Sequence, residues 1–189
     1  MTAILDCFDR IKVQPGDVLF IPGGVPHAIG EGILMVEIME PSDLVVRFEF
    51  ENAGYTLPES ARFMNRGLDF CMDIFDFDAM PESVVRNKYM FEPQSEVSYG
   101  NAGARYGLIG PETTPCFRVK KSIIRETVER EEQSFFIGVV TSGSGVLKSS
   151  GSVVELGTFD KFFCPAGLGL YLIEAESEIQ ILECFPPES

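Results

Sequence analysis

The sequence contains a single histidine, His27, and no tryptophan among its 189 residues. One imidazole argues against a Cys-His or Ser-His-Asp catalytic site, because none of the cysteines has a histidine near it in sequence. The five cysteines are far apart and form no C-x-x-C pair, which indicates neither a disulfide framework nor a zinc knuckle. We therefore expect the thiols to be reduced.

Positive charge is also scarce. Fifteen Lys and Arg stand against 29 Asp and Glu, and the resulting net charge of −14 repels nucleic acid and anionic membranes. No apolar run approaches the roughly 18 residues that span a bilayer. The first ten residues carry an early acid and no basic segment, unlike a signal peptide. The sequence predicts a cytoplasmic protein with neither nucleic acid nor a membrane as its partner.

The abundant residues favour a β-rich fold. Eighteen Gly and twelve Pro indicate many short elements joined by tight turns. Residues 1–12 have the apolar spacing of a helix end, and strands are predicted over 18–22, 32–40 and 43–50. Along 43–50 apolar and polar residues alternate, as in a strand with one buried face.

The middle of the chain has a different pattern. From Pro58, apolar residues recur at helical spacings, which predicts one helix of about fifteen residues. Residues 79–115 are rich in Pro, Gly and Asn and predict an irregular connection. From residue 116 onward about seven strands with short turns are expected, which is the pattern of a sandwich or barrel.

The two β-rich regions contain a repeat. The segment "GDVLFIPGGVPHAI" (16–29) aligns with "FDKFFCPAGLGLYL" (159–172), and His27 then falls on Leu170. We expect two related β units, of which only the first has the histidine. The matched positions include Asp17 with Asp160, Phe20 with Phe163, and Pro22 with Pro165.

Three side chains are candidate site residues, and for each of them a purely structural role is the alternative to a functional one. His27 follows a turn and is either a metal ligand or a satisfied structural residue. Glu37 lies on an apolar face, where a carboxylate needs a partner or a raised pKa, unless it reaches solvent at a strand end. Arg47 lies on the polar face of its predicted strand and could simply pair with Glu49 or Asp43.

The sequence motif around His27 points to a protein family more specifically than the three candidate residues do one by one. The spacing Gly16-x5-Pro22-x-Gly24-x2-His27 resembles the second cupin motif, in which a strand brings one histidine into a small β-barrel toward a metal. The extension "PHAIGEGILMVEIMEPSDLVVRFEF" (26–50) is similar to the type I mannose-6-phosphate isomerase (phosphomannose isomerase) family of the cupin superfamily. In that family a Pro-His-Ala-hydrophobic-Gly segment precedes a Glu-bearing strand and a Ser-Asp-x-x-x-Arg strand. The resemblance covers most of the chain.

The resemblance implies a role for each candidate residue. His27 would be a zinc ligand, and Glu37 a metal-site carboxylate that also serves as the proton-transfer base. Arg47 would face the reacting oxygens or the phosphate of a hexose 6-phosphate. The reaction implied is the interconversion of mannose 6-phosphate and fructose 6-phosphate by proton transfer between C1 and C2, assisted by zinc.

The chain also departs from this family. The family's other zinc ligands come from a Gln-x-His pair and a Lys-Thr-Glu segment, and this sequence has neither. Because a catalytic zinc normally needs three protein ligands, we expect this chain to be the C-terminal part of such a protein and to be inactive alone. Strand edges left uncovered in the first barrel would favour a homo-oligomer.

The predicted fold is mainly β: a cupin-type (jelly-roll) double barrel with one inserted helix and an incomplete first barrel. Residues 1–57 are the partial first cupin, 58–115 the helix and irregular connection, and 116–189 a second, metal-free cupin. The predicted function is that of a mannose-6-phosphate isomerase-like protein in a fragmentary or truncated form. The alternative is a non-catalytic cupin module that binds a small molecule or serves assembly.

Overall fold

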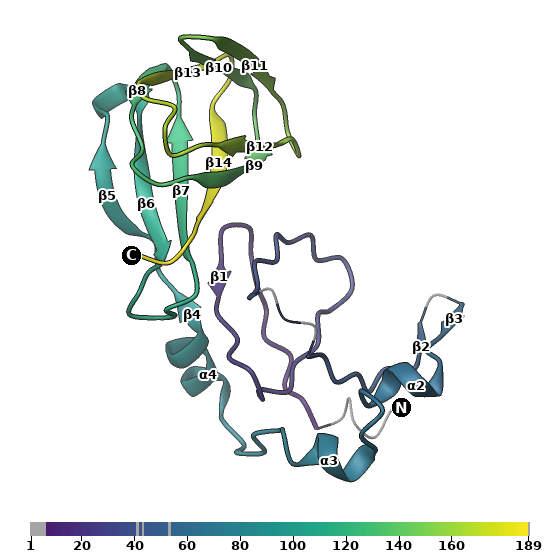
Figure 1. The fold of residues 1–189 in the computed structure, drawn as a ribbon. Helices are drawn as coiled ribbons and strands as arrows, with labels where there is room; N and C mark the ends of the chain where they lie inside the picture. The colour runs from purple at the N-terminus through teal and green to yellow at the C-terminus, as the bar shows by residue number, and fades with distance from the viewer. Residues whose placement is uncertain (1–6, 41, 43, 53, 189) are drawn as a thin grey trace. The chain divides into compact units, whose positions relative to one another are not determined.

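The structure is a computed structural model that describes residues 7–40, 42, 44–52 and 54–188 (Figure 1). The chain divides into two compact units, Met1–Met90 and Phe91–Ser189. No helix in the described part of the chain is both long enough and apolar enough to cross a membrane.

The second unit consists almost entirely of strands. Between β5 and β6 there is one short 3-10 helix, Gly100–Ala102. The described strands of this unit are β5 (Gln94–Ser98), β6 (Gly103–Ile109), β7 (Arg118–Ile124), β8 (Thr127–Arg130), β9 (Phe136–Ser142), β10 (Gly145–Ser149), β11 (Ser152–Leu156), β12 (Lys161–Cys164), β13 (Tyr171–Ala175) and β14 (Ile179–Phe185).

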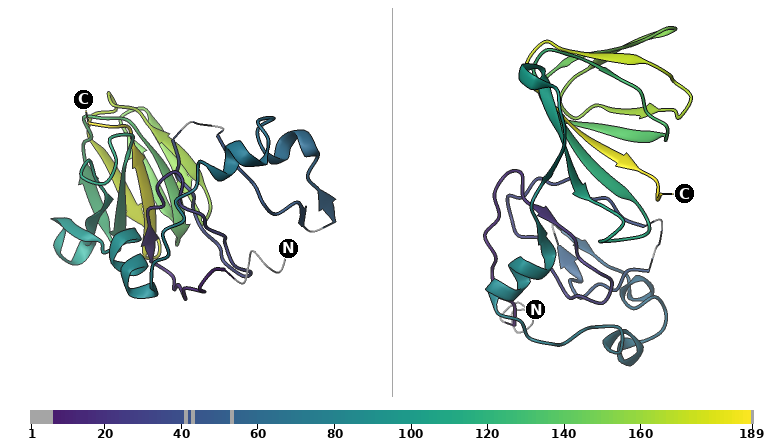
Figure 2. Two further views of the ribbon diagram at one scale, coloured as in Figure 1. Left: turned by 90° about the horizontal axis from the view of Figure 1, so that it is seen from below. Right: turned by 90° about the vertical axis from the view of Figure 1, so that its left-hand side faces the viewer.

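These strands form two sheets that face each other, as the views in Figure 2 show. One sheet has the order β12-β9-β14-β7-β6-β5 and the other the order β11-β10-β13-β8. Neighbouring strands in both sheets are antiparallel. Consecutive strands often belong to different sheets, so the chain wraps around one interior in the manner of a jelly roll.

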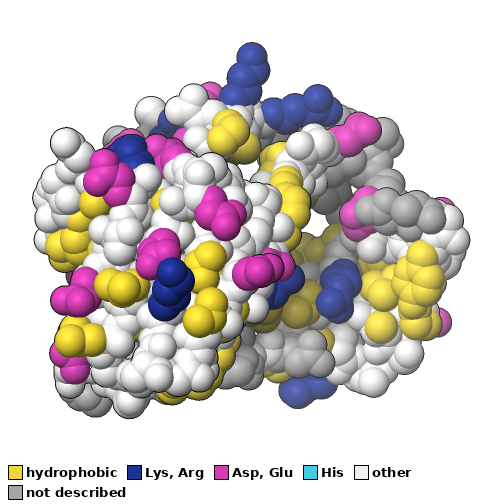
Figure 3. Space-filling view, turned by 90° about the horizontal axis from the view of Figure 1, so that it is seen from above, with side chains coloured by type: hydrophobic (Ala, Val, Ile, Leu, Met, Phe, Trp, Pro, Cys, Tyr) yellow, Lys and Arg dark blue, Asp and Glu magenta, His cyan; other side chains and the backbone are white. Residues whose placement is uncertain are grey.

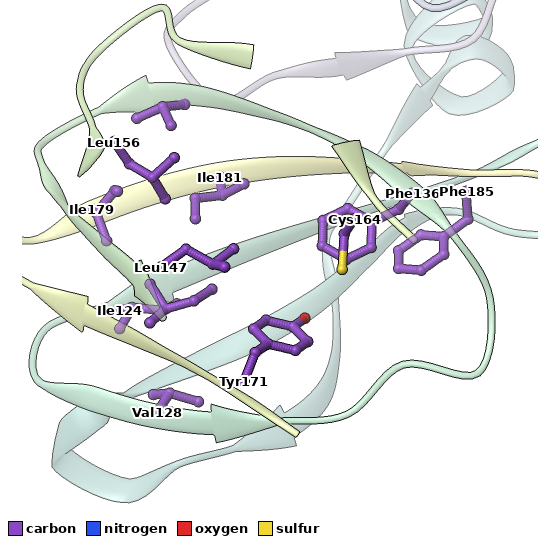
Figure 4. Packing of buried hydrophobic residues seen from close by; sticks show 12 residues of the cluster. Ile124, Val128, Phe136, Leu147, Leu156, Cys164, Tyr171, Ile179, Ile181 and Phe185 are labelled. Atoms are coloured by element: carbon purple, nitrogen blue, oxygen red, sulfur yellow. The ribbon is translucent and has the colours of Figure 1, made fainter. Parts of the chain in front are cut away.

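The apolar core of the second unit lies between the two sheets. Along β14 the buried residues alternate with half-buried ones, and Ile179 and Ile181 are fully buried. Burying one such side chain contributes about 1.5–3 kcal/mol relative to leaving it exposed. Figure 4 shows how side chains from both sheets meet in this core, which consists of Ile124, Val128, Phe136, Val140, Leu147, Leu156, Cys164, Tyr171, Ile173, Ile179, Ile181 and Phe185.

Two glycines are required by the turns of this unit. Gly103 begins β6 with φ of 147°, and Gly143 lies between β9 and β10 with φ of 81°. A Cβ on Gly103 would collide with the backbone carbonyl of Ile123, and one on Gly143 with that of Glu178. Only glycine fits both the backbone angle and the close approach at these positions.

The first unit has much less regular structure. Its strand β1 (Val18–Leu19) pairs with β4 (Met90–Phe91), and β2 (Glu51–Asn52) pairs with β3 (Tyr55–Thr56). The described helices are α2 (Glu59–Arg62), α3 (Leu68–Met72) and α4 (Glu82–Tyr89).

A cluster of aromatic rings is the main packing feature of the first unit. The ring centroids of Phe48 and Phe50 lie 6.0 and 5.7 Å from that of Phe63. The centroid of Phe75 lies 5.2 Å from that of Phe48. Arg47, which precedes Phe48, and Glu49, which lies between Phe48 and Phe50 in sequence, are exposed. The predicted alternation is therefore present over 46–50 but not at Leu44, which is 81% exposed, and this stretch forms no strand.

The prediction of three strands in the first unit was largely wrong. Of 18–22, only Val18–Leu19 is a strand, and no described residue of 32–40 or 44–50 lies in one. A strand is stable only when neighbouring strands accept and donate its backbone hydrogen bonds. The described residues of this unit provide no neighbouring strands for 32–40 and 44–50. Of the predicted helix end over 1–12, residues 1–6 lie outside the described residues and 7–12 form no helix.

The prediction of one inserted helix was also wrong. The expected helix from Pro58 is instead two short helices, α2 and α3. Met64 and Asn65 between them have φ of 52° and 56°, in the left-handed region that ends a right-handed helix. The stretch predicted to be an irregular connection, 79–115, contains a third helix, α4, and the strands β4, β5 and β6.

The predicted mainly β fold is confirmed, and the second unit has the jelly-roll arrangement of strands. The strands expected from residue 116 onward are present as β7 to β14, with the first predicted strand divided into β7 and β8. Because β5 and β6 precede residue 116 and belong to the same six-stranded sheet, the sheet begins earlier than expected. The division into 1–57, 58–115 and 116–189 stays a prediction.

Candidate functional site

A tight turn places His27 in the first unit. The backbone N–H of Val25 donates to the carbonyl of Pro22 at 3.3 Å. Gly24, with φ of 86°, lies so close to Ile74 that a Cβ would be 2.9 Å from the Ile74 carbonyl oxygen. Glycine is thus required here, and the turn before the histidine is fixed against the segment that follows α3.

The imidazole of His27 has one nitrogen engaged. Its Nδ1 lies 2.8 Å from the carbonyl oxygen of Val25. Because a carbonyl can only accept, Nδ1–H is the donor, and the neutral ring then has its lone pair on Nε2. The side chain is exposed, so Nε2 is the nitrogen that a metal ion could bind.

The second unit contains the counterpart of this turn. Asp160 follows Asp17 by 143 positions (160 − 17). The Oδ2 of Asp17 accepts a hydrogen bond from the backbone N–H of Gln14 at 2.9 Å, and the Oδ2 of Asp160 accepts one from that of Gly157 at 2.7 Å. Each aspartate therefore makes the same contact with the residue three positions before it.

The same shift relates the turns themselves. In the second unit the N–H of Leu168 donates to the carbonyl of Pro165 at 3.2 Å, as Val25 does to Pro22 in the first. The position of His27 is taken by Leu170, which is exposed. The predicted repeat is confirmed at the level of backbone hydrogen bonds, and the second copy has no imidazole.

Glu37 and Arg47 lie in the same unit as the histidine but are not joined to it. Both side chains are exposed. Among the described residues, no hydrogen bond or ion pair connects His27, Glu37 and Arg47. The backbone N–H of Arg47 donates to the carbonyl of Arg62 at 3.4 Å, next to the aromatic cluster. The roles assigned to these three residues stay predictions.

A complete zinc site is not formed by the described residues. They contain no group of three or more His, Cys, Asp or Glu side chains placed to hold a metal ion. A catalytic zinc normally has three protein ligands, and His27 can supply one through Nε2. Further ligands would have to come from residues other than those described.

The interior of the second unit holds a group of charged side chains that the sequence analysis missed. We call Arg105, Ser122, Arg130, Glu132 and Glu183 the barrel ion cluster. The Oε1 of Glu183 accepts hydrogen bonds from Arg130 Nη1–H and from the Ser122 hydroxyl, each at 2.6 Å. Arg105 Nη2 lies 2.6 Å from Glu183 Oε2. Both guanidinium groups also contact Glu132 Oε1 at 2.7 Å.

The barrel ion cluster pairs two arginines with two glutamates and holds Glu183 and Arg130 ionised. Burial opposes ionisation of Glu183, but the charges and hydrogen bonds of Arg130 and Arg105 outweigh it, so the pKa of Glu183 lies below its ordinary value. Burial likewise opposes the charge of Arg130, and Glu183 reverses this and raises the pKa of Arg130. Near neutral pH neither group gains or loses a proton, so the cluster is suited to structure rather than to acid–base catalysis.

A tyrosine and a cysteine border this cluster. The guanidinium carbon of Arg130 lies 5.8 Å from the ring centroid of Tyr171, and the Tyr171 hydroxyl points toward the Cys164 sulfur (Figure 4). Burial is the main cause that raises the pKa of Cys164 to about 11 and also raises the pKa of Tyr171. Since the thiolate is the nucleophilic form of cysteine, the Cys164 thiol is a poor nucleophile at neutral pH.

One sequence signal could have identified the barrel ion cluster. Glu183 lies on the same face of β14 as Ile179, Ile181 and Phe185, all of which are buried. A carboxylate on an apolar face is the same pattern that drew attention to Glu37. Its two arginine partners come from β6 and β8, which are separate from β14 in sequence, so the pairing itself could not be read from the pattern.

Comparisons with known proteins extend this picture. No protein-family model matches the chain. The protein described as probable mannose-6-phosphate isomerase GmuF of Bacillus subtilis (strain 168) is 26% identical over 174 residues, which cover 91% of this chain and 50% of GmuF. Mannose-6-phosphate isomerase ManA of the same organism is 23% identical over 175 residues, covering 89% of this chain and 49% of ManA. The resemblance to mannose-6-phosphate isomerases is confirmed.

The solved structures include a member of the same group. The crystal structure of the mannose 6-phosphate isomerase from Bacillus subtilis matches with a TM-score of 0.49 and 18% identity, over 71% of this chain and 37% of that one. The chain spans about half the length of the mannose-6-phosphate isomerases GmuF and ManA. The activity of those complete proteins is therefore a proposal for this chain.

Proposed function

We propose that the chain carries the histidine-bearing part of an aldose–ketose isomerase that interconverts mannose 6-phosphate and fructose 6-phosphate with the help of a metal ion. The observation that supports this most is the similarity to GmuF and ManA, which extends over 91% and 89% of the chain. It includes the Pro-His-Ala segment and the strand-like stretches that carry Glu37 and Arg47.

His27 is the proposed zinc ligand of this chain. The hydrogen bond from its Nδ1–H to the Val25 carbonyl leaves Nε2 available. When bound, zinc would polarise the oxygens of the sugar at C1 and C2. The remaining ligands of the site are expected from outside the described residues.

Glu37 is the proposed base. Its carboxylate would take the proton from C2 of mannose 6-phosphate, which gives an enediol, and the same proton would return to C1 to give fructose 6-phosphate. No oxidant or second substrate is needed, because the reaction only moves one carbon-bound proton and one hydroxyl proton.

Arg47 is the proposed anchor for the anionic substrate. Figure 3 shows Asp and Glu side chains spread over one face of the molecule, in line with the net charge of −14. Such a surface repels a sugar phosphate, so the substrate needs a local cation. Arg47 is exposed and can form charge-assisted hydrogen bonds with phosphate or sugar oxygens.

The assay for this proposal follows fructose 6-phosphate formed from mannose 6-phosphate in the presence of zinc. Once the other zinc ligands are provided by a second polypeptide, we expect isomerase activity that is lost in His27→Ala. Elemental analysis should find zinc bound to the unsubstituted protein and less zinc bound to His27→Ala. Activity that is insensitive to His27→Ala would contradict the assignment.

A second candidate is a non-catalytic cupin module. The observation that favours it is that the second unit has its own core and a self-balanced barrel ion cluster. Under this alternative the chain binds a small molecule or serves assembly, and we would find no isomerisation under any condition. The isomerase assay separates the two candidates.

A further inference from the structure

We propose that the second unit binds a phosphate group, as a small dianion, at three cations gathered around the ring of Phe185. These cations are Arg105, Arg118 and Lys120, and we call them the Phe185 cations. The site lies in a different unit from His27 and needs no metal ion. It is therefore independent of the proposed isomerase function.

Strand register places the Phe185 cations on the inner face of the six-stranded sheet. On β7, Arg118 lies opposite Phe185 of β14, and Lys120 lies opposite Glu183. Directly opposite residues project from the same face of a sheet, and both Phe185 and Glu183 are buried in the interior of the unit. Arg105 comes from β6, the next strand of this sheet, and is itself buried.

The Phe185 ring brings the three positive groups together. It lies at one end of the apolar core, next to Phe136 (Figure 4). The guanidinium carbons of Arg105 and Arg118 lie 5.3 and 5.4 Å from the Phe185 centroid, and Lys120 Nζ lies 5.7 Å from it. Because like charges repel one another, cations gathered in this way need negative charge among them.

Two carboxylates supply negative charge to the outer two cations, and both are free to leave. Lys120 Nζ lies 2.7 Å from Glu96 Oε2, and Arg118 Nη1 lies 3.2 Å from Glu188 Oε1. The side chains of Glu96 and Glu188 are 32 and 61% exposed. Ion pairs that reach solvent contribute little to stability, so either carboxylate can turn into water and give its place to a ligand oxygen.

A glycine provides the space that one of these carboxylates occupies. Gly107 of β6 lies opposite Lys120. A Cβ at Gly107 would be 2.7 Å from Glu96 Oε1, so any other residue would push this carboxylate aside. When Glu96 turns outward, the same space is open to a ligand oxygen beside Lys120.

A buried donor of Arg105 calls for an acceptor that the described residues do not supply. The guanidinium contacts Glu132 through Nη1 and Glu183 through Nη2. Its Nε has no hydrogen-bond partner among the described residues, and the Arg105 side chain is only 8% exposed. Buried N–H groups are paired with few exceptions. The group that completes the site must therefore accept hydrogen bonds, as a phosphate oxygen does.

Charge balance favours a dianion over a monoanion. Glu96 and Glu188 together carry two negative charges, and their departure leaves Arg118 and Lys120 uncompensated. One phosphate or phosphate monoester carries a charge of about −1.5 to −2 at pH 7 and replaces both carboxylates, whereas acetate replaces one. Arginine also matches the geometry of phosphate with paired N–H donors, and lysine adds a point charge.

Amide NMR of the full chain tests the proposal. The chain is titrated with inorganic phosphate at pH 8, where phosphate is a dianion, and at constant ionic strength, so that screening does not change. We expect saturable shifts at residues 105–107 and 118–120, and little change there with acetate. Fructose 6-phosphate is the second probe. Saturation at a lower concentration than with inorganic phosphate would assign the site to a phosphate monoester, and saturation at a higher one to the free ion.

Loss of one cation should weaken binding. Hydrogen bonds to charged groups are strong enough that Lys120→Met should raise the Kd for phosphate by about tenfold or more. The matched control is Lys148→Met, because Lys148 belongs to the other sheet and pairs with Glu174 at 2.6 Å. It removes the same charge and should leave the Kd unchanged. Melting curves show whether both variants fold.

Loss of a displaced carboxylate should strengthen binding, which a purely structural ion pair would not do. Glu96→Gln removes the competitor for Lys120 and should lower the Kd for phosphate by about twofold to fivefold. The control is Glu178→Gln, which changes the net charge equally at the surface pair with Arg125 and should leave the Kd unchanged. This gain of affinity is measurable even if Lys120→Met does not fold.

Four results would overturn the proposal. Shifts with acetate as large as those with phosphate would show no preference for a dianion. Equal losses in Lys120→Met and Lys148→Met would assign binding to the general field of the chain. Unchanged or weaker binding in Glu96→Gln would show that this carboxylate is not displaced. Phosphate binding that Arg47→Ala abolishes would place the ion in the first unit. Because none of these results involves isomerase activity, the two proposals fail separately.

Discussion

Asp17 and Asp160 make the same hydrogen bond in two different units: each carboxylate accepts from the backbone N–H three residues before it, at 2.9 and 2.7 Å. The turn that follows each aspartate is also closed by the same backbone bond. These contacts are local, so the turn before His27 can form without the strands that surround its counterpart. The two units differ in what comes directly after the turn: in the second unit the strands β13 and β14 follow, whereas the described residues of 28–42 in the first unit lie in no strand.

The barrel ion cluster predicts a large effect for one substitution in the second unit. Glu183→Gln removes the carboxylate that balances Arg105 and Arg130, and it leaves buried positive charge without compensation. We expect a loss of about 3–5 kcal/mol in the free energy of unfolding, measured by denaturant titration. The matched control is Glu178→Gln, because Glu178 pairs with Arg125 at the surface at 2.9 Å. An exposed pair is worth about 0–1 kcal/mol, so equal losses in the two variants would contradict a structural role for the cluster.

The same residue predicts a pH dependence. The pKa of Glu183 is lower in the folded protein than its ordinary value, which is about 4.3 in the unfolded chain. A lowered folded pKa gives a contribution that is fully present above the unfolded pKa and is lost as the pH falls toward the folded one. We expect the free energy of unfolding to fall with acidification below about pH 5, and to do so less steeply in Glu183→Gln. Identical pH profiles for the two proteins would count against this account.

Sequence reasoning succeeded where structure depends on neighbouring residues. The strands from residue 116 onward follow from alternation and from turn residues, and the repeat follows from matching turns. The turn around Gly24 could be recognised because its conformation requires glycine there. The second unit then closes on itself, because every strand it needs lies within its own sequence.

Sequence reasoning failed where structure depends on distant partners. Residues 32–40 have a good strand pattern, but a strand forms only beside other strands, and the described chain supplies none there. The helix expected from Pro58 ends early because Met64 and Asn65 take left-handed angles that no spacing rule signals. The ion pair of Arg105 with Glu183 joins β6 to β14, which only the folded barrel brings together.

The close approach at Gly143 predicts that this residue cannot be replaced. A Cβ there would collide with the Glu178 carbonyl, and its φ of 81° disfavours other residues. We expect Gly143→Ala to lower the free energy of unfolding by about 1–3 kcal/mol, seen as a lower melting temperature. Gly151→Ala is the control, since nothing lies within 4 Å of a Cβ at that position. If both variants melt alike, the packing around Gly143 is not as tight as the structure indicates.

The proposed role of Arg47 predicts a kinetic effect. A hydrogen bond to a charged group is worth about 1.5–3 kcal/mol, so Arg47→Ala should lower kcat/KM for mannose 6-phosphate by about tenfold to a hundredfold when the chain is assayed with zinc and the half of GmuF that it does not match. Arg47→Lys should restore part of the loss because it keeps the charge. The exposed Arg10 serves as a control position, where Arg10→Ala should leave the kinetics unchanged. An Arg47→Ala enzyme with normal kcat/KM would remove this residue from the site.

The isomerase assay of the reconstituted pair tests the central claim most directly. The chain is mixed with the unmatched half of GmuF and zinc, and the formation of fructose 6-phosphate from mannose 6-phosphate is followed, with each polypeptide alone as a reference. The account predicts activity in the mixture that neither polypeptide shows alone and that His27→Ala abolishes. No activity in the mixture, or activity that survives His27→Ala, would contradict it.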